Sequence, residues 1–290
     1  MAEAQELNAA FQAILHLHQS APPPVGPPLA PEPAPVDGGA VRRRHQRTAL
    51  RGLGIFKRAE RARARLAADL AAESEVDELN GRNRTDRERV QTELDHRWAA
   101  LCDNDPDVVL CTLAEAFEDN EAPAAAVSVD GSVLGLAVLV PGIEVVPERM
   151  PRRTDTGALV IQRITKTTRA AFYRLVVCGH LLATLREAFA VAPSITSIRA
   201  AVIRQSAPDQ DGRRRPECLF AGRFARHALE GVLWAQANAA EIVIDTVNEA
   251  RFRLAGRTKE LAPLDLAEEG ELALLLGAVE SEELATLGAD

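Results

Sequence analysis

The stretch KTTRAAFYRLVVCGHLLATLREAFAV, residues 166–191, decides the fold that the sequence predicts. Its apolar residues recur every three or four positions, which places them on one side of a helix with 3.6 residues per turn: Leu175, Cys178, Leu182, Leu185 and Phe189. A threonine among residues 165–168 can cap the start, and Pro193 ends the helix because proline cannot continue the hydrogen-bond ladder. We therefore expect a helix from about Lys166 to Val191 with a buried apolar stripe.

The opposite side of this predicted helix is polar and carries Lys166, Arg169, Tyr173, His180, Thr184 and Glu187. An amphipathic helix ordinarily turns such a face to solvent, and this is the interpretation that we expect. The alternative is a row of side chains that lines a cleft in which His180 moves a proton. The candidate residues of that cleft are Asp130, Glu144, Tyr173, His180 and Glu187.

Hydrophobic periodicity and turn signals on both sides of the central helix predict an α+β fold. Asp130 and Gly131 both tolerate positive φ, so they predict a tight hairpin. In chain order we expect helices beginning near residues 86 and 106, strands at 124–129, 132–140 and 159–164, the central helix, strands at 195–203 and 217–224, helices at 225–234 and 239–247, and a hairpin around Gly256. The prediction is a mixed sheet domain at residues 85–266 with an αβββαβ-like order and a loop at 141–156.

The order helix, three strands, helix, strand within residues 86–204 resembles the core of restriction-endonuclease-like nucleases. The resemblance covers the order of elements and implies an enzyme that gathers carboxylates and a lysine to hold Mg²⁺ and activate water. Asp130 offers one acid, but residues 159–164 supply neither an acid nor a lysine, and the chain has no Glu-x-Lys sequence. P-loop, G-x-S-x-G and H-E-x-x-H signatures are absent as well. An enzyme is therefore the alternative hypothesis, and no catalytic residue is assigned.

The composition fits a globular chain with one good core or two small ones, since 47% of its 290 residues are hydrophobic. No run approaches the roughly 18 apolar residues of a membrane span, and we see no secretion signal. The four cysteines, Cys102, Cys111, Cys178 and Cys218, lack zinc spacing. We expect reduced core thiols, a cytoplasmic location, and no metal or other cofactor.

Two segments precede the charged part of the chain. Residues 1–20 predict a short amphipathic helix, because Leu7, Phe11 and Ile14 have helical spacing. Such a short helix is marginal alone, so it could detach and bind a protein partner. Residues 21–40 form a Pro-rich linker, with proline at half of positions 21–36. Proline favours an extended spacer, or alternatively a ligand for a Pro-recognising domain.

Charge is strongly segregated in residues 41–84, which we expect to form a helical arm. Residues 41–65 hold ten cations against Glu60, a net of +9, whereas residues 66–95 have a net of −5. Arginine suits phosphate, and a dense basic segment is attracted to polyanions through counterion release. The binding residues that we assign are Arg42, Arg43, Arg44, Arg47, Arg51, Lys57, Arg58 and Arg61.

The acidic block suggests a different use of the same charges. It can fold back on the basic block as an αα-hairpin or pair with it in another copy, with a helix break expected at residues 80–83. The acidic tail, residues 267–290, could compete for the arm. The leading hypothesis is a non-catalytic intracellular binding protein whose basic arm contacts nucleic acid or another acidic partner. The alternatives are a nuclease-like enzyme and a self-associating structural protein.

Overall fold

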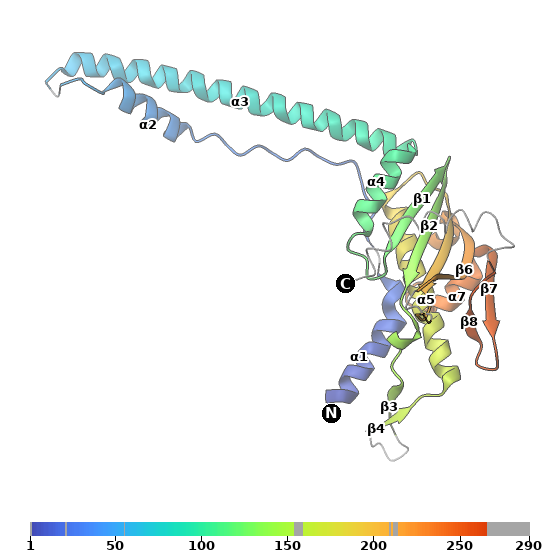
Figure 1. Cartoon of the computed structure of the whole chain (residues 1–290). Helices are drawn as coiled ribbons and strands as arrows, with labels where there is room; N and C mark the ends of the chain where they lie inside the picture. Colours follow the sequence, from blue (N-terminus) through green and yellow to red (C-terminus); the bar gives the residue numbers. More distant parts are fainter. Residues whose placement is uncertain are drawn as a thin grey trace. The chain divides into compact units, whose positions relative to one another are not determined.

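The computed structural model describes residues 2–20, 22–54, 56–153, 159–208, 210 and 214–265. The chain divides into two compact units, of which one is Gly26–Ala99 and the other contains the remaining residues. We call them the helical unit and the sheet unit and describe each by itself (Figure 1). The predicted α+β class is confirmed, because helices precede and interleave with a mixed sheet of six strands. The predicted acidic tail lies outside the described residues.

The main sheet has the strand order β1-β2-β5-β6-β7-β8, with β2 and β5 parallel and the other neighbours antiparallel. Its strands are β1 (Ala124–Asp130), β2 (Val133–Val140), β5 (Ser197–Gln205), β6 (Pro216–Ala225), β7 (Val247–Ala255) and β8 (Glu260–Ala262). A separate antiparallel pair is formed by β3 (Arg149–Arg153) and β4 (Leu159–Arg163). The expected loop at 141–156 therefore contains a strand that the sequence prediction missed.

The two predicted hairpins of the main sheet are present. Gly131 adopts φ +57° between β1 and β2, and Gly256 adopts φ +65° between β7 and β8. Both backbones enter the left-handed region, where glycine carries no steric cost. Since β2 and β5 are parallel, the chain must cross from one end of the sheet to the other, and the helix α5 lies in that connection.

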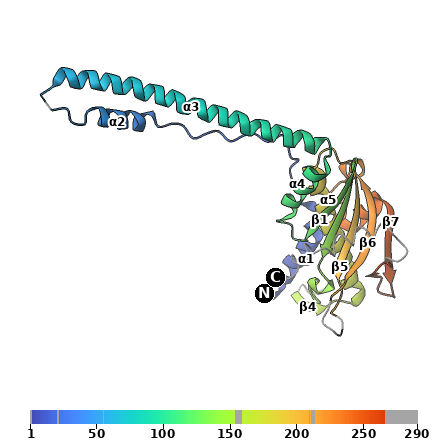
Figure 2. The ribbon, with the colours of Figure 1, turned by 45° about the horizontal axis from the view of Figure 1, so that its top comes forward.

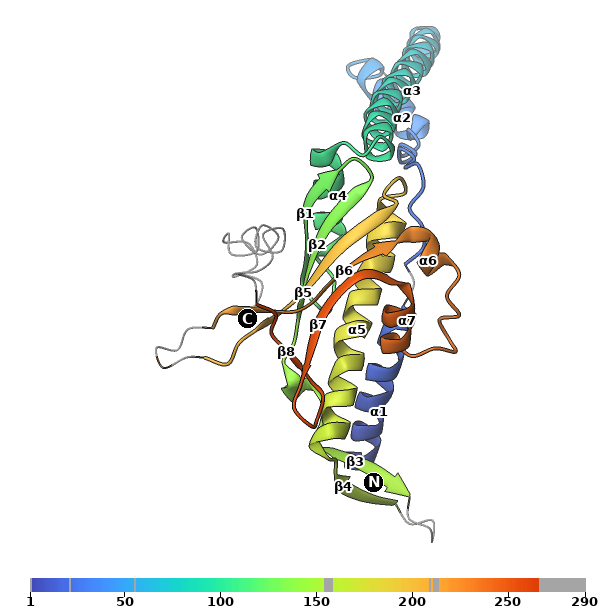
Figure 3. The same ribbon diagram turned by 90° about the vertical axis from the view of Figure 1, so that its right-hand side faces the viewer.

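The predicted central helix is confirmed as α5 (Lys166–Val191), and Thr165 caps it by accepting a hydrogen bond from the Thr168 backbone N–H at 3.1 Å. The expectation that its polar face is solvated is wrong, because Tyr173, His180 and Thr184 are buried. The sheet strands β2 and β5 contact α5, and further helices pack around the rest of it (Figure 3). These are α1 (Ala2–His16), η1 (Leu17–Gln19), α4 (Pro106–Phe117) and α7 (Ala239–Thr246).

Residues 2–19 pack on α5 through both apolar and polar contacts. Phe11 is 4% exposed, and its ring centroid lies 4.7 Å from that of Phe172 in α5. Gly179 permits a close approach, since a Cβ atom built there would lie 3.0 Å from Leu17 Cδ2. The N-terminal helix is thus predicted correctly, and its apolar side is part of the core of the sheet unit.

The helical unit contains α2 (Gly38–Ala49) and most of α3 (Arg58–Cys102), which lie side by side (Figures 1 and 2). The expected break at residues 80–83 is wrong, because α3 continues through them and past the expected boundary at 84 and 85. A lone glycine costs only about 1 kcal/mol inside a helix, and good helix formers lie on both sides of residues 80–83. The Pro-rich segment is extended as expected, and Gln91 ties it to α3 by bonding Ala30 N–H and Pro28 C=O.

No disulfide joins the four cysteines, as expected. Their predicted place in the core is correct for Cys218, which is buried, and wrong for Cys111, which is exposed on α4. Cys102 and Cys178 are partly buried. Burial raises the pKa of the Cys178 thiol to about 12, so this side chain stays a thiol at neutral pH.

Candidate functional site

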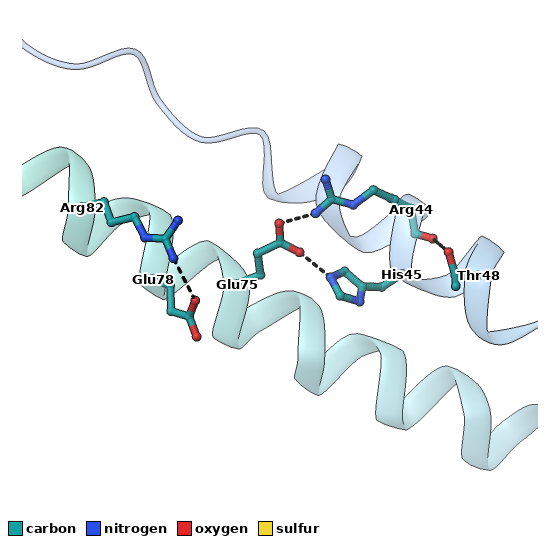
Figure 4. A network of polar contacts seen from close by, with 6 residues as sticks. All are labelled: Arg44, His45, Thr48, Glu75, Glu78 and Arg82. Atoms are coloured by element: carbon teal, nitrogen blue, oxygen red, sulfur yellow. Dashed lines mark hydrogen bonds and ion pairs between the residues drawn. The ribbon is translucent and has the colours of Figure 1, made fainter.

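Basic residues of α2 pair with acids of α3 in the part of the α2–α3 hairpin that contains Arg42, Arg43 and Arg44, which we call the base. Arg42 Nε lies 3.6 Å from Asp69 Oδ1, and Arg42 Nη2 lies 3.4 Å from Glu73 Oε1. Two residues further along each helix, the Glu75 carboxylate accepts from both Arg44 and His45 (Figure 4). Arginine on one helix therefore meets a carboxylate on the other.

The Glu75 contacts change the ionisation of the groups involved. The hydrogen bond from Arg44, followed by that from His45, holds the pKa of Glu75 below its usual range. The same bond raises the pKa of Arg44. Arg43 lies 3.7 Å from Asp37, whose side chain also caps α2. Arg42, Arg43 and Arg44 thus have their charges offset within the unit, as the fold-back alternative predicted.

The arginines nearer the connection between α2 and α3 are arranged differently. We call residues 47–65 the tip of the helical unit. Its arginines include five that are exposed and that make no ion pair to any described residue: Arg47, Arg51, Arg58, Arg63 and Arg65. Two other cations of the tip have local partners, because Lys57 Nζ lies 2.9 Å from Glu60 Oε2 and Arg61 Nη1 donates to Leu53 C=O.

The surface of the tip offers a shallow recess beside these arginines. Arg47, Thr48, Leu50 and Arg51 line a cleft of about 480 Å³. Phe56 is 92% exposed at the same end of the hairpin. The structure thus divides the eight predicted binding residues into three with offset charge at the base, three unpaired arginines at the tip and two tip cations with local partners.

The five candidate cleft residues on the sheet unit do not converge on one point. Tyr173 donates a 2.9 Å hydrogen bond to Pro141 C=O, immediately after β2. Its pKa is raised mainly by burial, and the charge of Glu144 adds to that rise. Asp130 is the last residue of β1 and is paired with Val133, at the opposite end of β2. The structure therefore brings Glu144 near Tyr173 and leaves Asp130 apart from them.

His180 and Glu187 lie further along α5 and have other neighbours. His180 is 8% exposed, and burial lowers its pKa, opposed by the charge of Glu121. Burial raises the pKa of Glu187, opposed by Asn120. The sequence did not single out Asn120 and Glu121, which follow α4. These two residues lie close to α5 because α4 packs on it, and no pattern in the neighbouring sequence predicts that contact.

Within the described ranges, no group of three or more His, Cys, Asp or Glu side chains is arranged to hold a metal ion. None of the described helices is both long and apolar enough to cross a membrane. Comparisons of the chain with protein-family models, curated proteins and solved structures find no match.

Proposed function

We propose that the protein is a non-catalytic intracellular binding protein whose tip contacts the phosphate backbone of nucleic acid. The observation that supports this proposal is the group of exposed, unpaired arginines at the tip. Residues 47–65 carry seven cations against Glu60 alone. This local excess persists in a chain whose formal net charge is −8, because the acids of α3 offset the base of α2 and not the tip.

The chemistry of the tip favours backbone contact over base recognition. Arginine forks match phosphate oxygens, and each neutralised phosphate releases condensed counterions. Phe56 is the aromatic residue of the tip, so stacking on successive bases has little support there. Binding should accordingly be independent of sequence and steeply dependent on salt.

The proposal is tested with a triple variant, Arg47→Gln, Arg51→Gln and Arg58→Gln, binding to a short DNA duplex over a range of salt concentrations. If all three side chains contact phosphates, the slope of log K against log salt falls by about 2 to 3. The matched control replaces Arg42, Arg43 and Arg44 by glutamine. It removes the same formal charge where carboxylates already offset it, so its slope should change by less than about 1.

Equal loss of binding in the two triple variants would contradict recognition at the tip, as would a wild-type chain that does not bind DNA. Circular dichroism of both variants checks that α2 and α3 still form. Adding Mg²⁺ to the same mixtures detects cleavage of the DNA, which would favour the nuclease-like alternative instead.

A second candidate, self-association through the helical unit, is favoured by Leu66 and Leu70. They lie one turn apart on α3 and are 64% and 61% exposed. Sedimentation of the DNA-free samples separates this candidate from the first, since it requires a discrete oligomer. A protein partner for residues 1–20 would have to use the exposed side of α1 or displace Phe11 from the core. We place the protein in the cytoplasm because no disulfide joins its four cysteines.

A further inference from the structure

A cleft of about 690 Å³ in the sheet unit lies beside His180, apart from the residues of the proposed tip interface. One wall comes from α1 and η1, and the other comes from α5 and the segment after α4. Figure 3 shows α1 running alongside α5. The volume falls within the range of roughly 300–1,000 Å³ that is usual for small-molecule sites.

Most of the wall is apolar. Ala13 and Leu17 face the cleft from the N-terminal segment, and Val176 and Ala183 face it from α5. The close approach at Gly179 holds Leu17 against α5 and so fixes the distance between the two walls. An aliphatic chain of a few carbons can lose its hydration here without displacing a side chain.

His180 in the wall of the cleft has unused hydrogen-bonding capacity. The residue is 8% exposed, and its ring makes no hydrogen bond to any residue in the described part of the chain. Burial lowers its pKa, so it is neutral at pH 7 and one ring nitrogen is an acceptor. A neutral ring nitrogen that accepts no bond from the protein leaves a place where a ligand donor can add a hydrogen bond.

The charge of the lining is negative. Asp119 and Glu121 contribute exposed carboxylates, and no lysine or arginine is among the lining residues. The cation nearest in sequence to the wall, Arg186, donates to His18 C=O and Ser20 C=O and stacks over Trp234 at 4.1 Å. An anionic ligand would meet carboxylates here, whereas a cationic ligand would be stabilised.

We propose that this cleft binds a small aliphatic amine in its ammonium form, with the ammonium group between Glu121 and His180 and the carbon chain against Leu17 and Val176. An ammonium group has three donors, which suit a carboxylate and a neutral imidazole nitrogen. A divalent metal ion fits less well, since the described side chains offer no group of three ligands.

The test uses the full chain with isotope-labelled histidine and follows the ring resonances by NMR during titration with n-pentylammonium. The resonance of His180 is identified by its loss in a His180→Gln variant. The uncharged probe 1-pentanol has the same carbon chain and serves as the ligand control. We expect pentylammonium to shift the His180 resonance saturably and pentanol to leave it near its starting position.

Two acidic variants separate the cleft from general attraction to a negative chain. Glu121→Gln removes the lining carboxylate and should weaken pentylammonium binding about three- to fivefold. Glu118→Gln removes an exposed carboxylate at the end of α4 that does not line the cleft, and it should leave the affinity unchanged. Equal shifts with pentanol, equal weakening by the two variants, or no saturable shift of His180 would overturn the proposal.

Discussion

One arginine closes the end of α5 and fixes the start of β5. Arg226 donates through Nη1 to Phe189 C=O, through Nη2 to Ala192 C=O and through Nε to Ile195 C=O, all within 2.9 Å. Its guanidinium also lies 4.6 Å from the centre of the Phe189 ring. A cation at a helix C-terminus meets carbonyls that have no partner inside the helix. The planar fork of arginine reaches three of them together, which a single ammonium group cannot do.

Replacing Arg226 by lysine should therefore destabilise the sheet unit although the charge is kept. We expect a loss of about 2 kcal/mol, because at least two charge-assisted hydrogen bonds and the ring contact disappear. Chemical denaturation monitored by fluorescence of the tryptophans measures the change. The graded control is Arg223→Lys, since Arg223 Nε makes one bond, to Ser197 Oγ at 2.8 Å. Equal stability of the two variants would contradict the role assigned to the fork.

Sequence reasoning had no means of finding Arg226 or the environment of His180. Arg226 falls among many arginines in the chain, and its three acceptors are 31 to 37 residues away. His180 was correctly placed on the polar side of its helix, but its burial depends on residues 10–20 and 119–122. Periodicity describes the faces of one helix and says nothing about what packs on them.

At the scale of elements, α1 is held on α5 by anchors at both ends. Phe11 is buried against Phe172, and Arg149 of β3 lies 2.9 Å from Glu3. At the end of η1, His18 Nε2 lies 3.2 Å from Trp234 C=O and 3.1 Å from Ala237 C=O, and is 1% exposed. Such a short helix is marginal alone in water, so its stability must come from these contacts.

Phe11→Ala should release α1 locally without unfolding the whole chain. Truncating a buried phenylalanine lowers the free energy of unfolding by about 3–5 kcal/mol if its helix stays packed. If α1 undocks instead, the loss is smaller. We expect proteolysis within residues 2–20 to become at least about tenfold faster, since cleavage follows the population of the open form. The matched variant is Leu15→Ala, because Leu15 is 37% exposed on the same helix. Equal cleavage rates in the two variants would show that Phe11 is not the anchor.

Elements with strong local signals were predictable, and the others were not. The cap at Thr165, the stop at Pro193 and the turn at Gly131 act through neighbouring backbone atoms, so α5 and the first hairpin follow from the sequence. Strand β3 contains Met150 and Pro151 among arginines and has no alternating pattern, and its pairing with β4 makes it a strand. The continuous α3 shows the converse, since its turn-like residues at 80–83 are outweighed by helix formers on both sides.

The charge pattern along the whole chain was predictable from the sequence, but which cations are paired with acids was not. The sequence locates ten cations beside an acidic block. It does not reveal that Arg42 and Arg44 each meet an acid 31 residues later while Arg47 and Arg51 lie beyond those pairs. That division depends on the register of α2 against α3. No local pattern in the sequence determines that register.

The two units also differ in what stabilises them, which predicts separate opening. In the helical unit the buried apolar side chains among the described residues are Ala30, Val41, Ala68 and Ala72, whereas α5 alone buries more than this. Exposed ion pairs supply much of the remaining stability of the helical unit, and each contributes about 0–1 kcal/mol. Amides of α3 between residues 60 and 95 should therefore exchange with solvent at least about a hundredfold faster than those of α5 between 176 and 189.

Hydrogen exchange measured by mass spectrometry at low and high salt tests this difference. Raising the salt to about 1 M shortens the Debye length to roughly 3 Å, so exchange in α2 and the facing part of α3 should accelerate. Exchange in α5 should not accelerate, because apolar burial against the sheet and its neighbouring helices protects it. Equal protection of α3 and α5, with no response to salt in either, would mean that the helical unit opens only when the whole chain unfolds.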